Sequence, residues 1–137
     1  MVDAAIARTS PNLVDRRILR HGGVLERLRP PHVNPALFRV VQKSGRTTQH
    51  TRGYIDLINT TVNITFTGVG VARFVRQFRV RGIGTNFSAP GDSGSLVTTF
   101  PTNQPVGLLF AGNASANTTF CNPIGTVLGA FGVNIVY

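Results

Sequence analysis

The chain has 137 residues, which is the size of one domain and leaves little room for a second core. Hydrophobic residues make up 42% of it and charged residues 14%, which excludes a disordered chain. No segment approaches the roughly 18 apolar residues that span a bilayer, and the first residues lack the basic start and apolar stretch of a signal peptide. We therefore expect neither a membrane partner nor an encoded secretion signal, and the sequence assigns no localisation.

Residues 1–35 differ from the rest of the chain. A short strand is predicted near Val2–Ala7, and a basic stretch rich in turn residues follows it. Three prolines, which cannot continue a helix or a central strand, lie at the end of this stretch: Pro30, Pro31 and Pro35. We interpret residues 1–35 as a remnant strand and a linker, and residues 36–137 as a β domain.

From about residue 36 the sequence predicts short strands separated by turns. The segment Val71–Arg81 alternates with a period of two, as a half-buried strand should, and only Arg76 interrupts its apolar face. The last two strands form a hairpin through Pro101–Asn103. Six such strands predict a closed antiparallel barrel or a sandwich. The predicted segments are Leu37–Lys43, Thr51–Ile58, Thr61–Thr67, Val71–Arg81, Ser95–Phe100 and Gln104–Ala111.

The C-terminal part contains one predicted helix and the only cysteine. Asn122 is placed to cap a short helix that has Pro123 at its first position and runs to about Ala130. Cys121 has no partner for an intrachain disulfide, and no catalytic motif surrounds it. We interpret it as a small buried thiol.

The formal net charge is +9, from 14 Lys and Arg against 5 Asp and Glu, so nucleic acid is a candidate partner. The basic residues are spread over three groups, however, and no zinc-ligand spacing, helix-turn-helix pattern or aromatic-basic RNA motif accompanies them. A solvated basic surface is the favoured interpretation, and nucleic-acid binding is the weaker alternative. No metal or organic cofactor is implied.

The chemistry-bearing motif is Pro90-Gly91-Asp92-Ser93-Gly94-Ser95. A serine hydroxyl is a poor nucleophile unless a neighbouring group orients it and removes its proton. Flanking glycines allow the amide N–H groups of Gly91 and Ser93 to converge on one point, where they could hold an oxyanion. Asp92 could be buried and paired so that its carboxylate locks the loop.

The motif and its surroundings resemble the second barrel of the chymotrypsin-like (trypsin-like) serine protease family. Gly91–Gly94 resembles the nucleophile loop, and Lys43–Thr48, followed by Gly53, resembles the strand that opens the second barrel in bacterial members. Asp3–Ala7 resembles the segment that supplies the triad carboxylate. The resemblance implies an all-β, six-stranded antiparallel Greek-key barrel, one half of a double barrel, with a short C-terminal helix.

The resemblance also implies roles for particular residues. Ser93 would be the nucleophile, Gly91 and Ser93 the oxyanion-hole donors, Asp92 the loop-locking carboxylate and Asp3 the residue that orients the histidine. A strand pairing with the substrate backbone would comprise Phe110, Ala111 and Gly112. Because Asn86–Ala89 contains no acidic residue, the specificity pocket is expected to be small and uncharged, and the substrate a peptide or protein.

The general base of the family is missing. Its histidine precedes the aspartate along the chain and belongs to the first barrel. All three histidines here follow Asp3, and we interpret them as surface residues: His21, His32 and His50. The chain alone is therefore predicted to be inactive or very weak.

Two functional interpretations follow. Either a histidine from a missing or separate first barrel completes a serine endopeptidase, or the chain is a non-catalytic protease-like module that acts in protein binding or self-assembly. In both, the face left by the missing barrel should be apolar and should favour a complementary first-barrel segment or a second copy.

Overall fold

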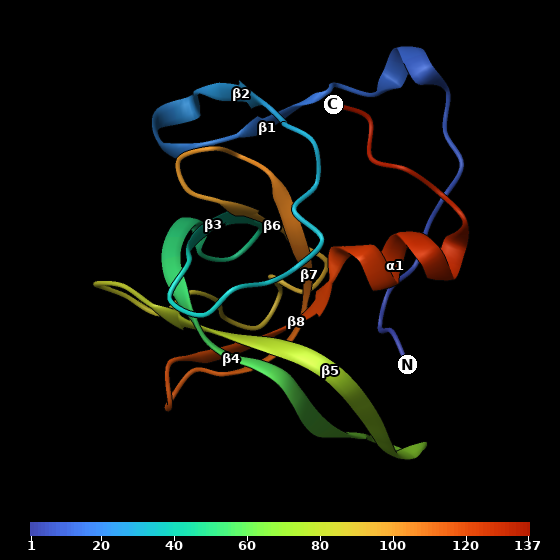
Figure 1. Ribbon diagram of the computed structural model, residues 1–137, viewed down its shortest axis with the longest axis vertical. Coiled ribbons are helices and arrows are strands. Elements are labelled where there is room, and N and C mark those ends of the chain that lie inside the picture. Colours follow the sequence, from blue (N-terminus) through green and yellow to red (C-terminus); the bar gives the residue numbers. More distant parts are fainter.

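The computed structural model describes residues 1–137, and a closed barrel of six antiparallel strands forms its centre (Figure 1). The strands follow one another around the barrel in the order β3-β4-β5-β8-β7-β6, and β3 pairs with β6 to close it. In β6-β3-β4-β5 the fourth strand returns beside the first, which is a Greek key. The predicted fold class is confirmed. The barrel strands are β3 (Val40–Gly45), β4 (Gln49–Phe66), β5 (Gly70–Gly82), β6 (Leu96–Thr99), β7 (Pro105–Asn113) and β8 (Thr118–Pro123).

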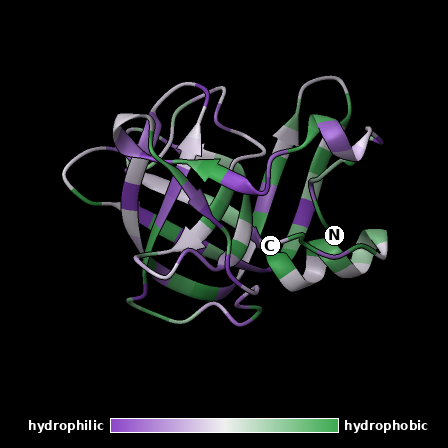
Figure 2. Ribbon diagram, turned by 90° about the horizontal axis from the view of Figure 1, so that it is seen from above, coloured by the Kyte–Doolittle hydropathy of each residue, from purple (hydrophilic) through white to green (hydrophobic).

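The core fills the barrel interior, with residues contributed by every strand and by the loop before β6. Hydrophobic and hydrophilic residues alternate along much of the barrel (Figure 2), as strands with one buried face require. Cys121 is fully buried in this cluster, which confirms its prediction as a buried thiol. The cluster comprises Val41, Ile55, Phe78, Val80, Phe87, Val97, Val106, Leu109 and Cys121.

Strands β4 and β5 extend past the barrel as a two-stranded ribbon (Figure 1). They can do so because β8 pairs with β5 only over Phe78–Arg81. The ladder shifts register where Asn59 and Arg76 take left-handed backbone angles, with φ of 49° and 58°. This bulge turns Arg76 away from the apolar face, which explains why it interrupts the alternation seen in the sequence.

Several predicted elements differ from those observed. The two strands predicted at Thr51–Ile58 and Thr61–Thr67 are one strand, β4, and strand β8 was not predicted. The predicted cap by Asn122 is wrong: the N-cap residue of the helix α1 (Ile124–Phe131) is Pro123, whose side chain has no hydrogen-bonding group, and Asn122 lies inside β8. The predicted strand at Val2–Ala7 is wrong, since no strand lies beside it to form a ladder. No helix in the structure is long and apolar enough to cross a membrane.

The N-terminal segment carries a small hairpin that the sequence did not reveal. Strands β1 (Arg17–Leu19) and β2 (Leu25–Arg27) pair with each other; the 3-10 turn η1 (Pro11–Leu13) precedes β1, and the 3-10 turn η2 (His21–Gly23) connects the two strands. Asn103, in the turn between β6 and β7, donates from Nδ2 to the carbonyl of Arg27 over 2.9 Å and accepts from the amide of Arg29 over 3.0 Å. These bonds attach the hairpin to the barrel.

Candidate active site

The turn that carries Ser93 is attached to the middle of β7. The amide of Gly94 donates to the carbonyl of Leu109 over 2.8 Å, and the amide of Leu109 donates to the carbonyl of Ser95 over 3.0 Å. Within the turn, the amide of Asp92 donates to the carbonyl of Ala89 over 3.1 Å. Ser93 itself is exposed. The backbone bonds therefore hold the serine at the surface while fixing both sides of its turn.

Two amide groups of the turn are left free. The N–H groups of Gly91 and Ser93 donate to no protein acceptor, whereas their neighbours at Asp92, Gly94 and Ser95 all do. Gly91 has a φ of 102°, and a Cβ at this position would collide with Thr47 Oγ1. Glycine is therefore required here for steric and conformational reasons. Unpartnered amide N–H groups beside an exposed hydroxyl can donate hydrogen bonds to an oxygen on which negative charge develops.

The Asp92 carboxylate ties this turn to the turn between β3 and β4. It is buried, and it accepts hydrogen bonds from the amides of Thr47 (2.8 Å), Thr48 (3.2 Å) and Ala89 (3.0 Å) and from Thr48 Oγ1 (2.6 Å). Burial alone would raise the pKa of Asp92, but the bonds from Thr48, Thr47 and Ala89 hold that pKa below its ordinary value.

Lys43 provides the positive charge for this network. Its Nζ lies 3.7 Å from Asp92 Oδ2, and both side chains are fully buried. Lys43 also donates to Thr48 Oγ1 over 2.5 Å and to the carbonyl of Gln49 over 2.9 Å. Burial lowers the pKa of Lys43, while the charge of Asp92 acts in the opposite direction. Sequence reasoning missed Lys43 and Thr48 as partners of Asp92, although both lie in the motif Lys43–Thr48.

A small pocket opens beside Ser93, with a volume of about 140 Å³. Of the strand residues expected to bind substrate, Ala111 and Gly112 line it, whereas the ring of Phe110 packs on Phe74 of β5 at 4.8 Å between centroids. Of the expected pocket segment, Ser88 and Ala89 contribute. No charged side chain lines the pocket, whose residues are Ser88, Ala89, Pro90, Ser93, Leu109, Ala111, Gly112 and Ala114.

Asp3 is attached to the barrel through its backbone. Asn122, which is fully buried, donates from Nδ2 to the carbonyl of Asp3 over 3.0 Å and accepts from its amide over 3.4 Å. Asn122 pairs with Leu108, next to the Leu109 that anchors the Ser93 turn. Asp3 and Ser93 are therefore connected to adjacent residues of β7. The Asp3 carboxylate is exposed and accepts no hydrogen bond.

None of the three histidines lines the pocket at Ser93. His21 is exposed, and His32 and His50 are partly buried. His50 was interpreted as a surface residue, but it is partly buried and its ring forms a 3.0 Å hydrogen bond with Gln42 Oε1. The pocket at Ser93 therefore contains no histidine that could act as its general base.

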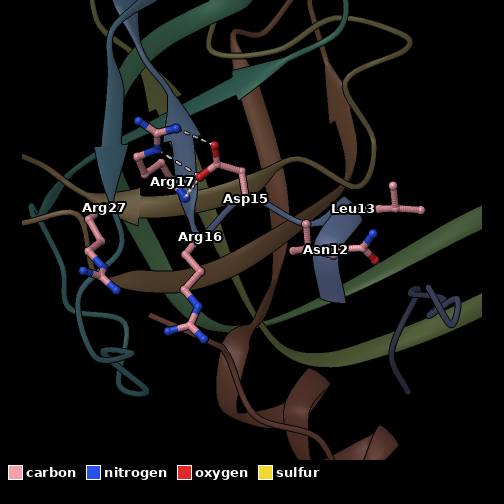
Figure 3. A pocket seen from close by; sticks show the side chains of 7 residues that line it. Asn12, Leu13, Asp15, Arg16, Arg17 and Arg27 are labelled. Atoms are coloured by element: carbon pink, nitrogen blue, oxygen red, sulfur yellow. Dashed lines mark hydrogen bonds and ion pairs between the residues drawn. The ribbon is translucent and has the colours of Figure 1, made fainter. Parts of the chain in front are cut away.

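The largest hollow lies elsewhere, on the N-terminal segment, with a volume of about 560 Å³ (Figure 3). Figure 3 shows the guanidinium of Arg17 turned toward Asp15, to which it is bonded over 2.7 Å. Arg16 and Arg27 complete an open basic surface. Because its charged groups are exposed and partly paired, this hollow has no feature of a reaction site.

Comparison with solved structures identifies the architecture. The chymotrypsin of Cellulomonas bogoriensis superposes with a TM-score of 0.70 at 25% identity, covering 88% of this chain and 61% of that one. Protease A of Thermobifida fusca superposes with a TM-score of 0.71 at 25% identity, covering 89% and 61%. A glutamic-acid-specific serine protease, which uses a histidine triad in substrate binding, gives a TM-score of 0.69 at 25% identity, covering 88% and 59%.

The sequence itself matches no protein-family model and no curated protein. The structural match covers most of this chain but only about 60% of each solved structure, which is consistent with one barrel of a two-barrel enzyme. The chain is thus related to the chymotrypsin-like serine proteases and has the fold of one half of them.

Proposed function

We propose that this chain is the nucleophile-bearing half of a serine endopeptidase, in which Ser93 attacks a peptide carbonyl and forms an acyl-enzyme. The observation that carries the proposal is the combination at one turn of an exposed serine, two unpartnered amides and an adjacent pocket. An acyl-transfer site needs these three parts within reach of one carbonyl group.

The remaining parts of the site have defined roles in this proposal. Gly91 and Ser93 donate to the oxyanion, and Asp92 keeps their amides in place through its bonds to Thr47 and Thr48. Asp3 orients a histidine that comes from a first barrel, supplied by another segment or another chain. The histidine takes the proton of Ser93 and later gives it to the leaving amine.

The pocket indicates the side chain that precedes the scissile bond. Its walls are alanine, glycine, proline and serine, with Leu109 as the only large residue. Since no charge there could pair with a charged substrate, small apolar side chains are preferred. A peptide library cleaved after Lys, Arg or Glu by the completed enzyme would contradict this assignment.

The test is labelling of the purified chain with a fluorophosphonate probe, with and without added imidazole. Imidazole can replace the missing base from solution, so labelling should be very slow alone and faster with imidazole. Ser93→Ala should abolish it, while Ser115→Ala, which removes another exposed serine, should leave it unchanged. A folded chain whose Ser93 stays unlabelled at high imidazole would overturn the nucleophile assignment.

A second candidate is a non-catalytic protease-like module that binds a partner. It is favoured by the exposed, unbonded Asp3 carboxylate and by the absence of histidine from the Ser93 pocket. The labelling experiment distinguishes the two candidates, because added imidazole should not increase the labelling of Ser93 in a non-catalytic binding module.

A further inference from the structure

A third hollow, of about 230 Å³, lies between the N-terminal hairpin and the turn that joins β3 and β4. It shares no residue with the pocket at Ser93. Leu19 is the only hydrophobic residue among those that line it, and most of the others carry a polar or charged side chain. The residues that matter for its chemistry are Arg20, His21, Gly22, Ser44, Thr48 and His50.

Arg20 brings a buried positive charge to this hollow. The residue is only 5% exposed, and Nη2 donates to Thr98 Oγ1 over 2.7 Å and to Asn103 Oδ1. Its Nε and Nη1 have no hydrogen-bond partner. The carboxylate of Glu26 is 3.7 Å from Nε and nearly half exposed, so it neutralises the charge only in part. Buried donors left without a protein partner point to an ion or water that completes them.

His50 adds a nitrogen whose role depends on its protonation. Gln42 donates from Nε2 to the carbonyl of Thr99 over 3.4 Å, so its Oε1 accepts from His50 Nε2. The Nδ1 atom of His50 is thereby left free, and on protonation it becomes a donor.

The groups that face His50 are mostly cationic. They come from the hairpin, from β3 and from β4, and burial together with their charges lowers the pKa of His50. The carboxylates nearby are Glu26, already beside Arg20, and Asp92, which accepts four hydrogen bonds. The cationic groups are Arg20, His21, Lys43 and Arg52.

The hairpin turn contributes backbone donors. Gly22 and Gly23 have φ of 70° and 80°, and the amides of His21 and Gly22 donate to no protein acceptor. Successive free N–H groups in such a turn form a concavity that suits an anion.

We propose that this hollow is a binding site for a small oxyanion, namely a sulfate, phosphate or carboxylate group. The free amides of His21 and Gly22 and the imidazoles of His21 and His50 hold its oxygens, and the buried guanidinium of Arg20 supplies positive charge. The site does not depend on the chemistry at Ser93, so it stands or falls separately from the proposed peptidase function.

The test is a nuclear magnetic resonance titration of the whole chain with sodium sulfate, with sodium acetate and, at matched ionic strength, with sodium chloride. We expect sulfate to cause saturable shifts at the amides of residues 21–23 and 44–50, with chloride causing none. If the shifts saturate at a lower concentration of acetate than of sulfate, the ligand is a carboxylate. If they saturate at a lower concentration of sulfate, the ligand is a sulfate or phosphate group. Sulfate binding should also raise the pKa of His50, and it should therefore tighten as the pH falls from 7.5 to 5.5.

Variants connect the shifts to the residues. His21→Ala should weaken sulfate binding several-fold, whereas His32→Ala, which removes a histidine outside the hollow, should not. Arg20→Gln should weaken it further, and His21→Ala keeps the test valid if Arg20→Gln does not fold. Equal responses to sulfate and chloride, or sulfate binding that His21→Ala and Arg20→Gln leave unchanged, would overturn the proposal.

Discussion

Lys43 and Asp92 form the one ion pair of the structure in which both side chains are fully buried. Such a pair costs desolvation, and it is tolerated only when further hydrogen bonds satisfy both groups. Here Thr48 does so for both, since Thr48 Oγ1 donates to Asp92 and accepts from Lys43. The pair therefore positions the Ser93 turn rather than adding much net stability.

Removal of one partner should consequently be far more damaging than loss of an exposed pair. Asp92→Asn leaves Lys43 as an uncompensated buried charge, and the free energy of unfolding should fall by about 3–5 kcal/mol. Urea denaturation measures this. Asp15→Asn, which removes the exposed pair with Arg17, is the matched control and should change stability little.

The free energy of unfolding should also fall in acid, because the carboxylates of Asp56 and Asp92 become protonated. Burial would raise the pKa of Asp56, but the hydrogen bonds and charges of Arg79 and Arg81 lower that pKa below the ordinary 3.8. The pKa of Asp92 is lowered in the same way by hydrogen bonds from Thr48, Thr47 and Ala89. These groups bind protons more weakly when folded, so their contribution is full above about pH 4 and is lost as the pH falls through the folded pKa. Urea unfolding between pH 2 and 7 should show a shallower acid decline for Asp56→Asn than for the unaltered chain, and an equal decline would refute the assignment.

At the residue scale, the sequence predicted which residues lie at the serine turn but not what surrounds them. Ser93 and Gly91 follow from a local motif, because a tight turn depends on adjacent residues. The bonds of Asp92 join positions 44 and 45 residues apart, and no local pattern encodes such contacts. Phe110 was predicted in the strand that pairs with the substrate backbone, and the sequence did not reveal that its ring packs on Phe74 of β5.

Among the elements, the β4–β5 ribbon departs most from regular geometry. Arg76 occupies the left-handed region, which costs a residue with a Cβ roughly 1–2 kcal/mol relative to glycine. Left-handed angles at Asn59 and Arg76 bend the ribbon where it leaves the barrel. The bulge therefore carries strain that a single substitution can relieve.

We expect Arg76→Gly to leave the free energy of unfolding unchanged or to raise it by up to about 1 kcal/mol, because glycine adopts this angle without a steric penalty. Arg73→Gly, in the regular part of the same strand, should lower it by about 0.5–1 kcal/mol. Thermal and urea unfolding of the two variants provide the comparison. Equal destabilisation by both would mean that the bulge is not strained.

Element prediction succeeded where burial produced a clear period and failed where it did not. Strand β5 was found from its alternation, and the bulge at Arg76 explains its one irregular position. Strand β8 was missed because Thr118, Thr119 and Asn122 are polar residues buried by tertiary contacts. The count of six strands was right only because one strand, β4, had been divided in two.

Across the whole molecule, the barrel is closed by a short seam. Strands β3 and β6 pair through three residue pairs, Val41 with Thr99, Gln42 with Thr98 and Lys43 with Val97. The buried cluster spans this seam, since Val41 and Val97 both belong to it. Opening the seam would expose the core, so the barrel should open as one cooperative unit.

Hydrogen exchange should therefore divide the molecule into two parts. Amides of the barrel, such as those of Val80 and Cys121, should exchange only through global unfolding, whereas amides of the ribbon near Phe66 and Val71 should exchange much faster. Mass spectrometry of proteolytic fragments after timed exchange measures this. Similar protection in the ribbon and the barrel would contradict it.

Reaction of the Cys121 thiol with a reagent in solution reports how often the barrel opens. The Cys121 thiol is fully buried, and burial raises its pKa far above the ordinary value. The native protein therefore protects it from a thiol reagent in two ways, because the reagent cannot reach the sulfur and the sulfur is not in the reactive thiolate form. Because it is the only cysteine, each modified molecule marks one opening of the barrel, with no label to attach and no second site to confuse the count. At a concentration of colorimetric reagent high enough for modification to outpace reclosing, the rate at which this single sulfur is consumed should equal the rate at which the closed barrel opens.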